Sequence, residues 1–165
     1  MNLIRTIPKI EAIGRWDIYE GDVVHRGDGV VMHGLTTVRK PMLSIEEHNL
    51  VDTTGKGLLL DRLFGVAGAG AALTQSGVGT SNTAAAVTDT SLTGQVLVVF
   101  DSTPTRSGLT VTTITTYPTG TANITWAECG QFNAVPTLFD RIAPIGPFTK
   151  TSAVSIVLTF ATTQS

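Results

Sequence analysis

Two stretches of the sequence, LTVTTITTY at residues 109–117 and AVSIVLTFATT at residues 153–163, decide the fold. In the second stretch, large apolar residues occupy every other position from Val154 to Phe160, which is the period-two pattern of a strand with one buried face. Threonine and β-branched residues dominate both stretches, and these residue types fit a pleated, half-buried surface. Both stretches are therefore predicted to be β-strands.

Further strands are predicted before and between these two. A strand is expected around residues 73–78, and the run Gln95–Phe100 is apolar on both faces, which is typical of a central buried strand. In the 109–117 stretch the alternation slips before Ile114, which indicates a bulge. Turns rich in Gly, Pro, Asn and Asp separate the strands, so we expect a mainly β, antiparallel β-sandwich of seven or eight strands.

The charged residues divide the chain into two parts. Residues 1–65 hold 17 of the 24 Asp, Glu, Lys and Arg side chains. Within this part, Gly27-Asp28-Gly29 lies between two short apolar stretches and predicts a β-hairpin, because Asp-Gly tolerates the positive φ angles of a tight turn. We therefore expect one domain with two parts: an N-terminal arm with a hairpin over residues 1–47, and the sandwich over residues 48–165.

One short helix is predicted near residues 55–65. Leu59 and Leu63, like Leu60 and Phe64, are four residues apart and share a face. Thr53 or Thr54 can cap the start, and Gly65 is placed to end the helix. A helix of two or three turns is stable only when it is docked, so the apolar face is expected to pack across one side of the sheet.

The sequence offers no catalytic constellation. The last 59 residues carry four charged side chains (Glu128, Asp140, Arg141 and Lys150), whereas a reaction site normally needs several titratable groups in one cleft. Glu128 continues the face of Ile124 and Trp126, so it is either a buried, hydrogen-bonded structural carboxylate or a strand-end residue that faces a partner. Cys129 is predicted to be a small buried apolar residue. We expect no enzyme activity, no cofactor and no metal site.

Charge and hydropathy bear on partners and location. The net charge of −2 and the pI of about 5.8 give no basic patch for nucleic acid. The N-terminus has no apolar core of a signal peptide, and no apolar run approaches the roughly 20 residues that span a bilayer. We expect a protein that is made in a cytoplasm, binds neither membrane nor nucleic acid, and, if it acts elsewhere, is carried there by assembly or cell lysis.

Aromatic and basic residues are the candidates for contacts with other proteins. Tyrosine, tryptophan and arginine dominate the energetics of many interfaces. In the N-terminal part the candidates are Trp16, Tyr19, Arg39 and Lys40, although Trp16 fits an ordinary core position equally well. In the sandwich, Tyr117 and Phe132 are the candidates for contact with a glycan or a cell surface.

Four phrases carry a family resemblance when they are taken in order: HNLVDTTGKGLLLDRLFG at 48–65, SGVGTSNTAAAVTDTSLTG at 76–94, ITWAECGQFNA at 124–134 and IAPIGPFTKTSAVSIVLTF at 142–160. Together they resemble a group of small structural proteins of tailed bacteriophages, described as virion, tail-fibre-like or decoration proteins with a β-sandwich core. In that group Ile and Leu are common where this chain has Cys129 and Gln131. The group carries no activity that could be transferred to particular residues.

The resemblance implies a location in a virion, with synthesis in the cytoplasm of a bacterial host. It predicts a capsid decoration, or cement, protein that binds the major capsid protein and copies of itself and so stabilises the head lattice. Decoration proteins often sit at local threefold positions, so a trimer is compatible with the resemblance, but the sequence does not specify the symmetry. The alternative is a tail or tail-fibre component, either an adaptor that binds tail proteins or a receptor-binding module.

Overall fold

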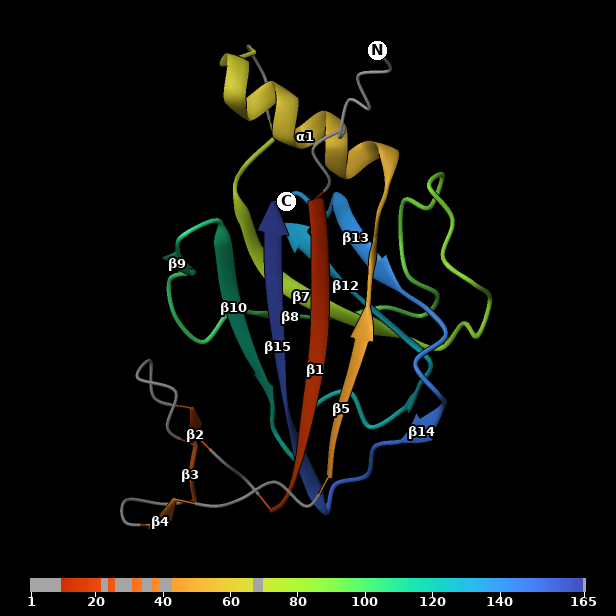
Figure 1. Cartoon of the computed structure of the whole chain (residues 1–165). Coiled ribbons are helices and arrows are strands. Elements are labelled where there is room, and N and C mark those ends of the chain that lie inside the picture. The colour runs from red at the N-terminus through yellow and green to blue at the C-terminus, as the bar shows by residue number, and fades with distance from the viewer. Residues whose placement is uncertain are drawn as a thin grey trace, which may run out of the picture.

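The computed structural model describes residues 10–21, 24–25, 31–33, 37–38, 43–66 and 70–164. Two five-stranded antiparallel sheets pack against each other, and one helix lies across an end of the resulting sandwich (Figure 1). The prediction of a mainly β, antiparallel sandwich with one short helix is confirmed. Within the described residues, the two main sheets contain ten strands rather than seven or eight, because several edge strands are only two to four residues long.

The first sheet has the strand order β5-β1-β15-β10-β9. Its strands are β5 (Leu43–His48), β1 (Ile10–Glu20), β15 (Val154–Gln164), β10 (Thr110–Tyr117) and β9 (Thr105–Ser107). The alternating stretch at the end of the chain forms β15, which lies at the centre of the sheet and pairs with β1 over its full length, from Ile10↔Gln164 to Glu20↔Val154. The two predicted strands that decide the fold, β10 and β15, are neighbours.

Residues 10–20 and 43–48 belong to this sheet and not to a separate arm, so the division at residue 48 is not a boundary of the sandwich. Two of the charged residues of this region, Arg15 and Asp17, lie on the outer face of β1. Arg15 Nε donates a hydrogen bond to Asp17 Oδ1 at 3.1 Å, while Trp16 between them points inward and is fully buried. These two charged residues lie on the solvent-facing side of a strand whose other side is in the core.

The predicted hairpin is present as a small sheet of its own. The strands β2 (Val24–His25), β3 (Val31–His33) and β4 (Thr37–Val38) pair in that order. Val24 pairs with Met32 and His25 pairs with Val31, both in antiparallel register, as predicted. The turn Gly27–Gly29 lies outside the described residues.

The second sheet has the order β6-β13-β12-β7-β8. Its strands are β6 (Leu50–Val51), β13 (Leu138–Ile142), β12 (Glu128–Asn133), β7 (Leu73–Gly79) and β8 (Val96–Val99). The strand predicted around residues 73–78 is β7. The run Gln95–Phe100 contains β8, but β8 is an edge strand with Val99 exposed, so the prediction of a central strand is wrong. A short pair, β11 (Thr125–Trp126) with β14 (Phe148–Thr149), lies beside the sheets.

The core lies between the two sheets and is built by both. In its centre, the rings of Tyr117 and Trp126 meet edge to face with centroids 4.8 Å apart. Such a pair stabilises a core beyond the area that it buries. The other fully buried apolar members come from β1, β7, β12 and β15: Trp16, Val78, Cys129, Ile156 and Leu158.

The bulge predicted in β10 is absent, and the slip in the sequence pattern has a different cause. The register with β15 runs unbroken from Thr110↔Thr163 to Tyr117↔Ile156. Thr113 and Thr115 face inward and are buried, while Ile114 packs on the outer face. The slip in the sequence pattern therefore marks threonines at inward positions. The irregular registers lie in β12, around Phe132.

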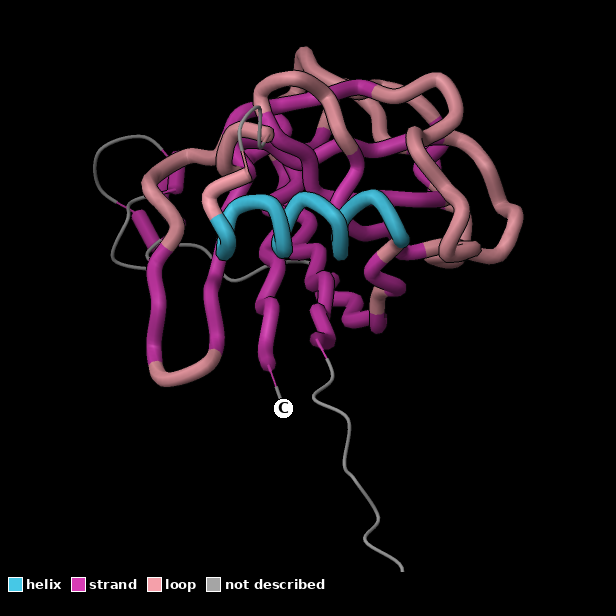
Figure 2. Tube along the Cα trace, turned by 90° about the horizontal axis from the view of Figure 1, so that it is seen from above, coloured by secondary structure: helices cyan, strands magenta, loops and turns pink. Residues whose placement is uncertain are grey.

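The helix α1 (Thr53–Phe64) lies across the ends of the strands (Figures 1 and 2), and not across the side of a sheet. Asp52, and neither Thr53 nor Thr54, caps its start, because Asp52 Oδ1 accepts a hydrogen bond from the Gly55 N–H at 2.6 Å. Gly65 ends the helix with a φ of 62°, as predicted.

Candidate functional site

The described residues that were predicted to bind partners lie in the interior. Trp16, Tyr117 and Phe132 are fully buried and Tyr19 is nearly so. Tyr117 also shares a hydrogen bond of 2.8 Å with the Ser76 hydroxyl. These four aromatic residues stabilise the fold and offer no exposed surface to a partner. The other two candidates, Arg39 and Lys40, lie outside the described residues.

A buried ionic cluster occupies the outer face of the second sheet. Arg141 Nε donates to Glu128 Oε2 at 2.7 Å, and Arg141 Nη1 donates to Asp89 Oδ2 at 2.7 Å. The other oxygen of Glu128 accepts from the backbone N–H groups of Ser81 and Thr93, at 3.0 and 2.7 Å. Of the two alternatives for Glu128, a structural carboxylate or a residue that faces a partner, these contacts show the first: it is buried and hydrogen-bonded.

This cluster fixes the segment 80–94, which covers the outer face of the second sheet. Arg141 Nη2 donates to the Thr83 carbonyl at 2.9 Å. Burial alone would lower the pKa of Arg141, but its hydrogen bonds to Asp89 and Glu128 raise it, so the guanidinium remains charged. Leu92 of the same segment packs on Phe132 and Leu138. The cluster is a structural clamp.

A second group of buried acids lies at the start of α1. The Asp140 carboxylate accepts hydrogen bonds from the Gln131 N–H at 2.9 Å and from Asn49 Nδ2 at 2.6 Å. Burial raises the pKa of Asp140 to about 7 and that of Asp52 to about 6. Asp52 Oδ2 is buried and has no hydrogen-bond partner. The donors facing Asp140 are amides rather than cations, so ionisation of this carboxylate is only partly compensated.

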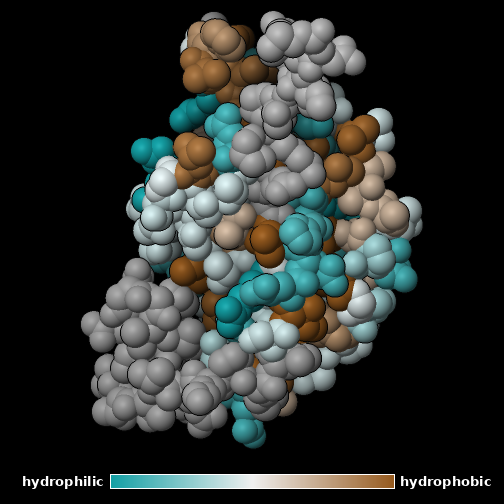
Figure 3. Space-filling model, viewed as in Figure 1, coloured by the Kyte–Doolittle hydropathy of each residue, from teal (hydrophilic) through white to brown (hydrophobic). Residues whose placement is uncertain are grey.

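The exposed side of α1 carries an apolar ridge. This apolar ridge consists of Leu59, Leu60, Leu63 and Phe64, which are 42%, 55%, 72% and 75% exposed. Figure 3 shows the apolar colour gathered over the helix at the top of the molecule. The expectation that these residues pack on the sheet is wrong.

The inner face of α1 explains why the ridge points outward. Gly55 lies so close to β13 that a Cβ atom there would overlap the carbonyl group of Phe139. The buried residues of the helix are Gly55 and Leu58. A glycine and one leucine therefore form the docking face, and the larger apolar residues remain on the opposite side. Gly55 was the feature of the sequence that could have indicated this docking face, because a buried glycine permits a backbone-to-backbone approach.

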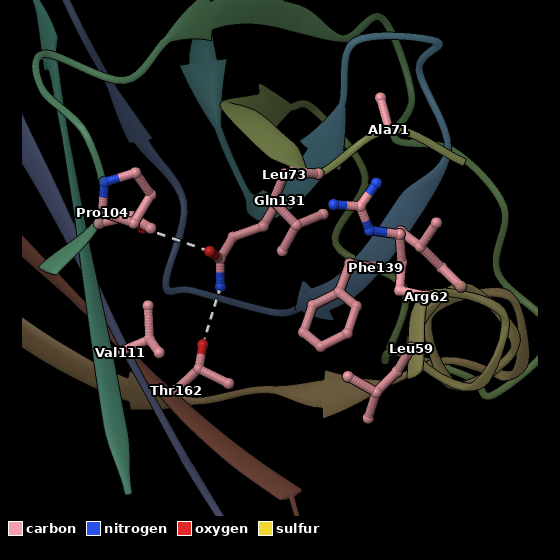
Figure 4. Close-up of a pocket in the computed structure, with 12 residues that line it drawn as sticks. Leu59, Arg62, Ala71, Leu73, Pro104, Val111, Gln131, Phe139 and Thr162 are labelled. Carbon is pink, nitrogen blue, oxygen red and sulfur yellow. Dashed lines mark hydrogen bonds between the residues drawn. The ribbon is translucent and has the colours of Figure 1, made fainter. Parts of the chain in front are cut away.

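A cavity of about 290 Å³ opens beside the inner face of the helix. Figure 4 shows Val111 and Thr162 of the first sheet on one wall and Phe139 and Leu59 on the other. No signal in the sequence had indicated it, because its walls come from six different elements and two irregular segments.

Within the described ranges, no cluster of three or more His, Cys, Asp or Glu side chains has the geometry of a metal site. The same residues contain no helix that is long and apolar enough to cross a membrane. Comparison with known proteins finds no matching family model, no similar curated protein and no similar solved structure.

Proposed function

We propose that this chain is a non-enzymatic structural protein of a tailed-bacteriophage virion that acts by binding other proteins. The observation that carries the proposal is the apolar ridge of α1. Scattered apolar residues are normal on a surface, but a contiguous group of large ones marks a site of interaction. In an aqueous environment, four such side chains on one helix favour a protein surface that covers them.

The charged side chains buried at the second sheet contact other parts of the fold, and this supports an interaction role. Arg141, Glu128 and Asp89 are engaged with one another and with the segment 80–94. Their contacts are those of a clamp that holds a loop. The polar chemistry of the second sheet therefore serves stability, while the exposed apolar area serves association.

Within the virion, we assign the chain to capsid decoration. The four phrases that resemble decoration and tail-fibre-like proteins cover α1, the clamped segment, β12 and the closing strand β15. A rigid sandwich with one apolar end suits a protein that adds to a preformed lattice. Its partners would be the major capsid protein and further copies of the chain, and its stabilising effect would grow with the number of contacts in the lattice.

The copy number per virion tests this assignment. Quantitative mass spectrometry of the virions that contain this chain would compare its amount with that of the major capsid protein. Hundreds of copies are expected. A few to a few dozen copies would contradict decoration and support the alternative, a tail or tail-fibre component.

A variant of the ridge tests the surface itself. The double substitution Leu63→Ser and Phe64→Ser should abolish retention of the protein on purified heads, and with it the gain in their resistance to heat. The matched control is Val99→Ser, which changes an exposed apolar residue on the edge strand β8. Heads that bind the double variant as well as the wild type would contradict a role for the ridge.

A further inference from the structure

The cavity beside α1 has walls of unusually uniform chemistry. Val111 of β10 and Phe139 of β13 face each other across it, and Leu58 and Leu73 close its sides. In Figure 4 the side chains of Val111, Leu73 and Phe139 lie around an open space between the first sheet and the helix. Its volume of about 290 Å³ is at the lower end of the range for small-molecule sites.

The polar side chains at the floor of the cavity are paired with one another. Gln131 Oε1 accepts a hydrogen bond from Thr113 Oγ1 at 3.2 Å, and Gln131 Nε2 donates to Asp140 Oδ2 at 2.8 Å and to Thr162 Oγ1 at 3.2 Å. The floor therefore leaves little hydrogen-bonding capacity for a ligand or for water. An apolar cavity of this kind holds water poorly and favours a hydrocarbon group.

The mouth of the cavity carries one charge. Arg62 is the charged member of the lining, and in Figure 4 its side chain reaches from α1 toward Leu73. Its Nη1 makes one long hydrogen bond of 3.4 Å, to the Gly70 carbonyl. Among the ion pairs of the described residues, none involves Arg62. An exposed guanidinium with this much unused donor capacity is complementary to a carboxylate.

We propose that this cavity binds a small amphiphilic monocarboxylate, with its hydrocarbon chain between Val111 and Phe139 and its carboxylate against Arg62. The inference goes beyond the proposed function and does not depend on it. A small molecule fits better than a side chain of a docked protein, because the ridge and the cavity share only Leu59. The rest of the apolar ridge, Leu60, Leu63 and Phe64, does not line the cavity.

Octanoate is the probe that tests the proposal, and 1-octanol is its uncharged counterpart. Amide chemical shifts of the intact chain would be followed by NMR as each compound is added. Octanoate should cause saturable shifts at Leu73, Val111 and Thr162, with a dissociation constant in the millimolar range or tighter, as expected for a ligand of this size. The alcohol should bind about tenfold more weakly, because it lacks the charge that pairs with Arg62.

Substitutions then separate the two parts of the site. Arg62→Gln should remove the difference between octanoate and 1-octanol. Val111→Phe and Ala72→Phe, which fill the cavity from opposite walls, should each abolish binding of both compounds. Arg106→Gln is the matched control, because it removes an exposed arginine of β9 that does not line the cavity. The spectrum of each variant without ligand shows whether the fold is retained.

Three results would overturn the proposal. The first is the absence of saturable shifts up to about 20 mM octanoate, well above the affinity expected for this size of ligand. The second is shifts confined to Leu63 and Phe64, which would indicate adsorption to the ridge. The third is unchanged binding by both cavity-filling variants. Because no virion component takes part, a failure here would leave the decoration proposal intact.

Discussion

The segment 80–94 and the helix α1 both pack against β13, but different forces hold them there. The segment is held by the charge of Arg141, which reaches Glu128, Asp89 and two backbone carbonyls. The helix is held by close backbone approach at Gly55 and by the cap at Asp52. Arg141 and Asp140 are adjacent in β13 and point to opposite faces of the sheet. Arg141 faces the segment 80–94, whereas Asp140 faces the interior.

Burial raises the pKa of a carboxylate in both places, but the net pKa shifts of Asp89 and Asp140 have opposite directions. Burial by itself raises the pKa of Asp89, but the Ala86 N–H and Arg141 lower it further than burial raises it. For Asp140 the same effect of burial dominates, because the groups around it are Gln131, Asn49 and the carboxyl group of Asp52. Ionisation therefore stabilises the clamped segment and destabilises the region at the helix cap.

The largest effect is expected from Arg141→Met. Removal of the guanidinium would leave Glu128 buried without a cation, which typically costs about 3–5 kcal/mol in the free energy of unfolding. Urea denaturation would measure this loss, and hydrogen exchange at Ser81 and Thr93 should accelerate. Adding Glu128→Gln to the variant should recover part of the stability. A loss equal to that of the exposed control Arg106→Met would contradict the clamp.

The next effect concerns pH and the region at the helix cap. Because the pKa of Asp140 in the folded state is about 7, above its ordinary value, the folded chain binds more protons than the unfolded chain between about pH 4 and pH 7. The contribution of this group to stability is greatest below about pH 4 and is lost as pH rises through 7.

The variant Asp140→Asn isolates this contribution. Between pH 4 and pH 8 its stability relative to the wild type should increase by on the order of 3 kcal/mol. Asp52→Asn should show a smaller change over a lower range, because the pKa of Asp52 is about 6. Urea denaturation at a series of pH values would measure both, and parallel curves for the variants and the wild type would refute the assignment.

Two glycines of α1 distinguish docking from helix propensity. Gly55→Ala would force the helix away from Phe139 and should lower the free energy of unfolding by about 1–3 kcal/mol. Gly57→Ala is the matched control, because no atom lies within 4 Å of the added Cβ. It should raise stability by about 0.5–1 kcal/mol. Thermal denaturation of both variants measures the contrast, and equal effects would mean that close approach does not hold the helix.

The smallest effect on stability is expected on the apolar ridge. Leu63→Ser should change the free energy of unfolding by no more than about 0.5 kcal/mol, because the side chain is mostly exposed. Leu58→Ala, on the docking face, should cost about 2 kcal/mol or more. Denaturation experiments on the two variants would establish whether the ridge contributes to the stability of the fold. A large loss from Leu63→Ser would show that it contributes to the fold.

Local patterns in the sequence were sufficient for much of the architecture. The alternation from Val154 to Phe160 predicted β15, and Gly65 predicted the end of α1. The patterns gave wrong predictions where the position of an element depends on what packs beside it. The apolar run Gln95–Phe100 predicts a central strand, but β8 has a neighbour on one side only. The spacing of Leu59, Leu60, Leu63 and Phe64 predicts an apolar face packed on the sheet, but Gly55 lets the other face of the helix dock instead.

The candidate sites depended even more on contacts between distant residues. Arg141 and Asp89 are 52 positions apart, so no spacing rule connects them. Residue type makes Tyr19, Tyr117 and Phe132 interface candidates and leaves Trp16 open between interface and core. Residue type does not distinguish a core aromatic from an exposed one. The cavity combines residues from α1, β7, β10, β12, β13 and β15 and follows from the packing of these elements.

The pairing of β1 with β15 has a consequence for the kinetics of folding. The paired residues are between 134 and 154 positions apart, so the centre of the first sheet forms only after nearly the whole chain has been brought together. In the second sheet, β12 pairs with β13 over less than 14 positions, and this pairing has no such requirement. High contact order slows folding to the millisecond-to-second range. We expect the β12–β13 hairpin to form early and the first sheet to close last.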